Sequence, residues 1–355
     1  MGDESKGRGN RMATIEDVAK RAGVSISTVS RVFNGTRFVN PTIAERVRAA
    51  AQELNYQPSR AARVLRGNRS KILGLLITNI QNPFFTALVR GVEDVAHERG
   101  YSVILCNSDE DPHKERQYIE VLCAERVAGA ILVPTREHQP AISLFHRHRI
   151  PVVAVDRRVK DEEVDAVLVD NIRGAREAVL HLISNGYRRI GIITGPLSTT
   201  TGRERLEGYR RALEEAGLPY EARLVRSGPF KESTGQVQTR ELLALDKPPE
   251  ALFLGNNLIT MGALDVLQEC GLRIPDDIAL VSFDDTPWAH LKTVSLTTVA
   301  QPVYELGSTA ALRLFQHLQI SPAGFLTRQE IILAPYLCIR GSSQPRLTDA
   351  SIVRK

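Results

Sequence analysis

From residue 72 to residue 283 the chain alternates short apolar runs with segments of helical periodicity. This alternation restricts the possible folds of the chain more than any other feature of the sequence. The apolar runs read ILGLLIT, YSVILC, GAILVP, VVAVD, VDAVLVD, RIGIITG, ALFLG and IALVSF. Such runs are typical of strands buried on both faces, and helices between them indicate parallel sheets covered by helices. There are too many strand–helix units for one domain, so we expect two similar α/β lobes joined by a hinge.

Residues 14–34, TIEDVAKRAGVSISTVSRVFN, predict two short helices joined by a tight turn. Thr14 is a suitable N-cap, and Asp17 three residues later makes an acidic variant of the capping box. The first helix should end at Gly23, and Ser25 can cap the second. Such a pair is either a helix-turn-helix that reads DNA or an ordinary pair of packed helices in a helical domain.

The distribution of charge favours the DNA-binding interpretation. Residues 1–70 contain thirteen Lys or Arg and six Asp or Glu, a net charge of +7, whereas the whole chain is +5 and residues 71–355 therefore carry −2. A basic module attached to a mildly acidic body indicates a polyanionic partner for the module alone. The side chains of the second helix that can then reach base edges are Ile26, Ser27, Ser30 and Arg31.

Two further segments follow the helix pair. NPTIAERVRAAAQELNYQPS predicts a third amphipathic helix that Pro58 closes. The next segment, SRAARVLRGNRS, is basic and rich in alanine, and its large apolar residues are Val64 and Leu65. A helix this short is not stable alone in water, so we expect it to fold only when docked on a partner.

Several separated segments carry a resemblance to a known family: MATIEDVAKRAGVSISTVSRVFNG, ELNYQPSRAARVLR and the alternating body. From residue 12 to the region of residue 340 they resemble the LacI–GalR family of bacterial transcription regulators. The resemblance implies an N-terminal all-α helix-turn-helix headpiece. It also implies a two-lobed body, like that of periplasmic binding proteins, built from two parallel α/β sheets.

The family pattern also implies the domain boundaries. We expect the chain to cross between the lobes near Asp170, Val299 and Thr327, because such a triple hinge permits closure around a ligand. The expected parts are a disordered extension (1–11), the headpiece (12–58), a hinge helix or linker (59–70), the N-terminal lobe (71–170 and 300–326), the C-terminal lobe (171–299 and 327–341) and a tail (342–355).

By this resemblance, Ile26, Ser27 and Arg31 occupy the base-reading positions of the recognition helix. Phosphate contacts are expected from Thr14, Ser25, Thr28 and Asn34. The hinge helix would pair with its two-fold mate in the minor groove, where Leu65 wedges between base pairs and Ala62 allows close approach. One headpiece covers one half-site, so the resemblance implies a pseudo-palindromic double-stranded operator and a homodimer. The tail has no leucine heptads of the kind that form tetramers.

Polar and aromatic residues follow the predicted strands at their carboxyl ends, where open parallel sheets bind ligands. Carboxylates, guanidinium groups and amides match the hydroxyls at the edge of a small sugar, and aromatic rings cover its faces. The set resembles, position by position, that of ribose-binding proteins of the periplasmic class, which implies ribose or a similar pentose as effector. Its members are Asn82, Phe84, Phe85, Asp156, Arg157, Arg205, Phe230, Asn256, Asp284 and Gln301.

Other effectors remain open. Two acids facing two arginines are formally neutral, which suits an uncharged sugar better than a phosphosugar. Asn257 stands where relatives commonly have Asp, and we expect it to face away from the sugar. Thr199 stands where purine-binding members have an Arg, so a nucleoside or purine is a weaker alternative. The last alternative is a cleft that binds nothing, in a regulator controlled by a protein partner.

Several functional classes are disfavoured by the sequence. There is no P-loop, nucleophile elbow or metal triad, so we expect neither an enzyme nor a metal or other cofactor. The four cysteines form no C-x-x-C pair and are expected to be reduced core residues. The N-terminus lacks the apolar region of a signal peptide, and no apolar run is long enough to span a membrane. We therefore expect a cytoplasmic, nucleoid-associated protein, and not a sugar-binding transport component.

Overall fold

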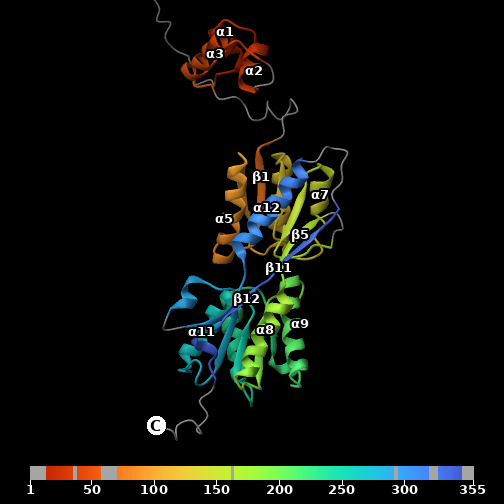
Figure 1. Cartoon of the computed structure of the whole chain (residues 1–355), viewed down its shortest axis with the longest axis vertical. Helices are drawn as coiled ribbons and strands as arrows, with labels where there is room; N and C mark the ends of the chain where they lie inside the picture. The colour runs from red at the N-terminus through yellow and green to blue at the C-terminus, as the bar shows by residue number, and fades with distance from the viewer. Residues whose placement is uncertain are drawn as a thin grey trace, which may run out of the picture. The chain divides into compact units, whose positions relative to one another are not determined.

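The computed structural model (Figure 1) describes residues 13–34, 38–56, 70–160, 164–291, 295–319 and 327–345. It divides into two compact units, Met1–Ser70 and Lys71–Lys355, which are described separately. The expected extension at 1–11 and the hinge segment with Ala62 and Leu65 lie outside the described residues.

In its described part the first unit contains the helices α1 (Ile15–Ala22), α2 (Ile26–Asn34) and α3 (Pro41–Glu53). Thr14 caps α1 with both hydrogen bonds of the capping box, and Gly23 ends the helix in the left-handed conformation with φ of 65°. The Arg46 guanidinium donates a 2.6 Å hydrogen bond to the Ala22 carbonyl and so ties α3 to the end of α1. The three helices share one apolar core of Val18, Ala19, Ala22, Val29, Val47, Ala50 and Ala51.

The second unit begins with a six-stranded parallel sheet in the order β11-β5-β4-β3-β1-β2. Helices α5 (Pro83–Glu98) and α12 (Val303–Gln319) pack side by side on one face (Figure 1), and α6 (Pro112–Ala124) and α7 (Ile142–Arg147) cover the other. The strands are β1 (Ile72–Ile77), β2 (Ser102–Asn107), β3 (Gly129–Leu132), β4 (Val152–Val155), β5 (Asp165–Val169) and β11 (Glu330–Leu333).

The second sheet has the order β12-β10-β9-β8-β6-β7 and repeats the plan of the first. Helices α8 (Asn171–Ser184) and α9 (Thr200–Glu215) cover one face, and α10 (Glu232–Leu243) and α11 (Asn257–Glu269) the other. All pairs are parallel except β10 with β12. The strands are β6 (Ile190–Thr194), β7 (Val225–Ser227), β8 (Ala251–Leu254), β9 (Ala279–Phe283), β10 (Thr297–Ala300) and β12 (Tyr336–Cys338). The predicted body of two parallel α/β sheets is therefore confirmed, with one antiparallel edge strand.

The chain passes between the sheets at three places. It leaves the first sheet at Asp170, which caps α8, and returns from β10 into α12. The third passage lies between β11 and β12 and not near Thr327, so the expected assignment of 327–341 to the second lobe is wrong for β11. Residues 330–338 form two strands, β11 in the first sheet and β12 in the second. Pro335 separates two strands there because it has no N–H to continue a ladder.

Burial follows the sequence pattern in the inner strands, but the expectation is wrong for the edge strand β2, in which Cys106 is the buried residue, and for two of the four cysteines. Strands β3, β4, β5, β6, β8 and β9 are buried along their whole length, as expected for sheets covered on both faces. Cys106 and Cys123 are buried, whereas Cys338 is half-buried on β12 and Cys270 is exposed at the end of α11 and is not a core residue. None of the helices in the described part of the chain is long and apolar enough to cross a bilayer.

Candidate functional site

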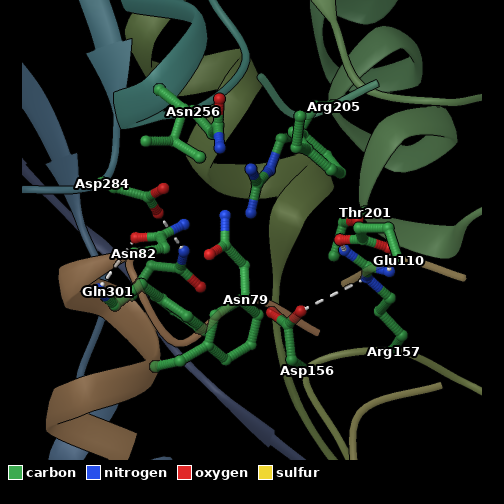
Figure 2. Close-up of a pocket in the computed structure, with 14 residues that line it drawn as sticks. Asn79, Asn82, Glu110, Asp156, Arg157, Thr201, Arg205, Asn256, Asp284 and Gln301 are labelled. Atoms are coloured by element: carbon green, nitrogen blue, oxygen red, sulfur yellow. Dashed lines mark hydrogen bonds and ion pairs between the residues drawn. The ribbon is translucent and has the colours of Figure 1, made fainter. Parts of the chain in front are cut away.

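A cleft of about 370 Å³, including its open mouth, lies between the two lobes at the carboxyl ends of their strands. All ten residues predicted for the ligand site line it, so the fold brings the whole predicted set together (Figure 2). Four further lining residues, Asn79, Glu110, Thr201 and Leu258, were not predicted. The complete lining is Asn79, Asn82, Phe84, Phe85, Glu110, Asp156, Arg157, Thr201, Arg205, Phe230, Asn256, Leu258, Asp284 and Gln301.

Two aspartates occupy equivalent positions in the two lobes. Asp156 follows β4 and Asp284 follows β9, and these strands have the same place in their sheets. Both residues have left-handed backbones, with φ of 69° and 76°, and each backbone N–H donates to a neighbouring strand, to Val167 at 2.9 Å and Val299 at 3.0 Å. A non-glycine residue in this conformation is strained, and such strain is concentrated at functional sites. The turn directs one carboxylate from each lobe into the cleft (Figure 2).

Burial dominates the electrostatics of both aspartates. It raises the pKa of Asp156 to about 6, against the attraction of Arg157 and Arg205. Burial also raises the pKa of Asp284, against the charge of Arg205 and hydrogen bonds from the Gln301 amide and the Asn257 backbone N–H. The charged form of a buried carboxylate is stabilised by any ligand that donates hydrogen bonds to it.

Arg205 is fixed before any ligand binds. It lies on α9, is 3% exposed, and donates from Nε to the Asn171 amide oxygen at 3.0 Å and from Nη1 to the Gly255 carbonyl. Its Cζ lies 3.7 Å from the centroid of the Phe283 ring, a close cation–π contact. The guanidinium points toward the middle of the cleft (Figure 2), where it can donate to a ligand oxygen without reorganising.

Arg157 forms a bidentate ion pair with Glu110, which sequence reasoning missed. Nη2 donates to Glu110 Oε1 at 2.7 Å and Nη1 to Oε2 at 2.8 Å. The lining therefore contains three acids and two arginines, a formal charge of −1, and the predicted neutral balance is wrong. The signal in the sequence was NSDED after the run YSVILC, but it did not show which acid turns into the cleft.

The aromatic residues belong both to the cleft and to the cores. Phe84 and Phe85 line the cleft, pack in the core of the first lobe and contact each other edge to face with centroids 5.1 Å apart. Phe230 lies beneath Arg157, with 5.5 Å between Cζ and the ring centroid. A Cβ on Gly195 would come within 1.9 Å of the Phe230 ring, so only glycine leaves room for this ring.

Polar contacts join the two lobes around the cleft. Asn257 lies beside the lining, and its amide donates a 2.8 Å hydrogen bond across the lobes to Asn82 Oδ1. At the far side, Arg203 on α9 pairs with Glu137, and Glu204 on α9 pairs with Arg158, which follows β4. The structure therefore shows the lobes held together by direct contacts as well as by the three chain passages.

In the first unit, the three predicted base-reading residues are exposed on α2: Ile26, Ser27 and Arg31. The predicted phosphate-binding hydroxyls are engaged in capping. Ser25 Oγ accepts from the Thr28 N–H at 3.2 Å and lies 2.9 Å from Thr28 Oγ1, and the Thr14 hydroxyl bonds Asp17 at 2.8 Å. Asn34 ends α2, and its side chain lies outside the described residues.

Two family models and several known proteins match this chain. Residues 14–59 match "Bacterial regulatory proteins, lacI family", and residues 70–335 match "Periplasmic binding proteins and sugar binding domain of LacI family". The chain is 41% identical over 333 residues to the ribose operon repressor of Escherichia coli K12, covering 94% of this chain and all of the relative. It is 37% identical to the HTH-type transcriptional repressor PurR of Actinobacillus pleuropneumoniae, covering 93% and 98%. A LacI family regulator from Enterococcus faecium, solved with bound ribose, superposes with a TM-score of 0.69 at 29% identity, covering 77% and 99%.

In the residues that the structure describes, no group of three or more His, Cys, Asp or Glu is arranged to hold a metal ion.

Proposed function

Because this chain belongs to the lacI family of bacterial regulatory proteins and is a DNA-binding transcriptional regulator, we propose that ribose or a similar uncharged pentose binds in its cleft and controls its affinity for an operator. The observation that carries the proposal is the convergence of ten residues, chosen from sequence, on one cleft between two lobes.

The cleft has the chemistry that a pentose requires. Asp156 and Asp284 offer buried carboxylates from opposite lobes, and Arg205 is held ready to donate. Phe84, Phe85 and Phe230 supply rings for the C–H faces of a sugar. A ligand that bonds both aspartates links the lobes and stabilises their closed arrangement.

We extend the proposal to DNA through the exposed face of α2. Ile26, Ser27 and Arg31 are proposed to read base edges in the major groove, where Arg31 matches guanine and Ile26 a thymine methyl. Thr14, Ser25, Thr28 and Asn34 are proposed to contact phosphates, and Leu65 with Ala62 to enter the minor groove. This mode of binding requires a homodimer on a two-fold site.

A purine or nucleoside is the second candidate, since the PurR relative is 37% identical. One observation weighs against it. Thr199, where purine-binding members have an Arg, is the N-cap of α9 and accepts a 3.3 Å hydrogen bond from the Gly202 N–H. The position therefore serves the helix and offers no cation to a base.

Thermal unfolding with a panel of pentoses, hexoses, nucleosides, purines and phosphosugars tests the proposal. Ribose at one hundred times its dissociation constant stabilises the fold by about 2.7 kcal/mol, which for a body of this size raises Tm by about 5 °C. Asp284→Ala should abolish the rise, whereas Asp276→Ala, at an exposed acid on the same lobe, should retain it. No shift with any pentose would refute the proposal, and a shift with purines alone would select the second candidate.

A further inference from the structure

The Glu110 carboxylate binds the two terminal nitrogens of the Arg157 guanidinium, which can also bind a ligand oxyanion. The two Glu110 oxygens accept from Nη1 and Nη2 of Arg157 at 2.8 and 2.7 Å, and Nη1 also donates to the Pro134 carbonyl at 3.2 Å. Arg157 is 3% exposed, while Glu110 is half-buried and lines the cleft. Planar guanidinium groups bind carboxylates and phosphates either through this end-on fork or through the side-on pair of Nε and one Nη. Glu110 holds the first, so a ligand oxyanion would have to displace Glu110 there, and Asp156 Oδ2 lies 3.6 Å from Nε at the second.

The Nε of Arg157 has an ion-pair neighbour but no hydrogen-bond partner among the described residues. This nitrogen is buried and lies 3.6 Å from Asp156 Oδ2. A buried donor without a partner is costly, and a ligand hydroxyl can satisfy it. With its end-on fork closed by Glu110 and its Nε edge facing the Asp156 carboxylate, Arg157 has its remaining N–H donors beside negative charge, where a neutral hydroxyl fits better than a second anion.

The backbone at Glu110 forms an unusual turn, and this turn places the side chain against Arg157. Asp109 and Glu110 have consecutive left-handed conformations, with φ of 53° and 59°, after the end of β2. The Glu110 N–H donates to the Thr78 carbonyl at 3.1 Å, and Asp111 caps α6 directly afterwards. Two non-glycine residues in this region are unfavourable, so the surrounding contacts must hold the turn.

Glu110 decides the net charge of the cleft lining. Burial acts to raise the pKa of Glu110, but the charge and hydrogen bonds of Arg157 outweigh it, and the pKa lies below its ordinary value. Glu110 is therefore ionised at neutral pH. With Asp156 and Asp284 ionised against Arg157 and Arg205, the cleft has a formal charge of −1, and without Glu110 it would be neutral with an open guanidinium.

We propose that Glu110 is the charge-selectivity residue of the cleft: it closes the Arg157 fork and excludes sugars that carry a negative charge. This inference rests on the proposed function, because it concerns the same cleft and a sugar ligand. It adds that the ligand class is limited to uncharged polyols, and that sugar phosphates and sugar acids are rejected by one side chain.

Calorimetric titration of the full-length protein at neutral pH tests this assignment with ribose, ribonate and ribose 5-phosphate. Ribonate is the critical probe because it matches ribose in carbon number and carries a carboxylate; its open chain is the same for every variant, so the change in preference between variants reports the charge. The variants are Glu110→Gln and Glu110→Ala, which remove the charge, and Glu110→Asp, which keeps it. The matched control is Asp109→Asn, which removes a charge from the same turn at an exposed acid paired with Lys114.

We expect the unaltered protein to prefer ribose over ribonate by about a hundredfold, and the Gln and Ala variants to reduce this preference at least about tenfold, as removal of a like charge predicts. Asp109→Asn and Glu110→Asp should change it less than about threefold. Ribose binding with an unchanged preference in a folded Gln or Ala variant overturns the inference alone. Absence of ribose binding in the unaltered protein overturns the proposed function and the inference with it.

Discussion

Asp156 should make ribose affinity depend on pH. Burial raises the pKa of this carboxyl to about 6, although Arg157 and Arg205 attract its charge. An ionised carboxylate accepts strong hydrogen bonds from sugar hydroxyls, and protonation removes its charge-assisted contribution. We therefore predict that ribose binds the ionised form and that its affinity falls as the pH decreases through 6.

The magnitude follows from the ionised fraction. With a pKa near 6, this fraction falls from ~0.97 at pH 7.5 to ~0.09 at pH 5.0, so the dissociation constant should rise about tenfold, equivalent to ~1.4 kcal/mol. Burial raises the pKa of Asp284 as well, so protonation of this carboxyl acts in the same direction. Glu110 should not contribute, because its pKa is held below the ordinary value despite burial, through the charge of Arg157.

The pKa of Asp156 also determines the direction in which the free energy of unfolding of the ligand-free protein changes with pH. Its pKa in the folded protein lies above the ordinary 3.8, so between pH 4 and 6 the folded state binds more protons than the unfolded state. The contribution of Asp156 to the free energy of unfolding therefore decreases as the pH rises through this window. Ribose should oppose this trend, because it binds the ionised form.

Calorimetric titrations with ribose at pH 7.5, 6.5, 5.5 and 5.0 and constant ionic strength measure the effect. Asp156→Asn should bind more weakly at pH 7.5 and should lose much of the pH dependence. Asp276→Asn, at an exposed acid of the second lobe, should keep the full slope. A dissociation constant that is unchanged from pH 7.5 to 5.0, or the full slope in the Asp156→Asn variant, would refute the reasoning.

Three other predictions concern closure, the aromatic wall and DNA. Asn257→Ala removes the hydrogen bond to Asn82 across the lobes, a bond worth ~0.5–1.5 kcal/mol. Ribose affinity measured by calorimetry should therefore fall about threefold to tenfold. An unchanged affinity would exclude a role of this bond in closure. Gly195→Ala should displace the Phe230 ring, whose Cζ lies 1.9 Å from the added Cβ, and lower both Tm and ribose affinity; normal values for both would contradict the packing. Leu65→Ala should weaken binding to an operator selected in vitro more than binding to unrelated DNA in fluorescence anisotropy, and equal losses would argue against a wedge.

Residues at strand ends were predictable from the fold class together with the family resemblance. The carboxyl ends of parallel strands meet at one edge of a sheet, so Asp284 and Asn256 could be placed near each other from the alternation of strands and helices. Asp156 belongs to the other sheet, and its place opposite them followed from the resemblance to a two-lobed family. The strands could be located from the apolar runs, because strands in sheets covered on both faces need apolar side chains along their length.

The missed features depend on contacts between distant residues. Glu110 faces Arg157, which lies 47 positions later in the chain. It does so through a left-handed turn that the residue types of NSDED do not predict. Asn257 bonds Asn82 across 175 positions, so its partner could not be inferred from local sequence. The break between β11 and β12 was predictable in part from Pro335, but the pairing of β11 with β5 depends on the free edge of the first sheet.

Control of DNA binding by the cleft is tested most directly by the operator affinity of the full-length protein with and without saturating ribose, measured by fluorescence anisotropy on an operator selected in vitro. We predict that ribose changes the affinity of the unaltered protein at least about fivefold, the lower range of allosteric coupling, and that Asp284→Ala shows no change. An operator affinity that ribose leaves unchanged, while calorimetry shows ribose bound, would contradict the central claim that the cleft controls DNA binding.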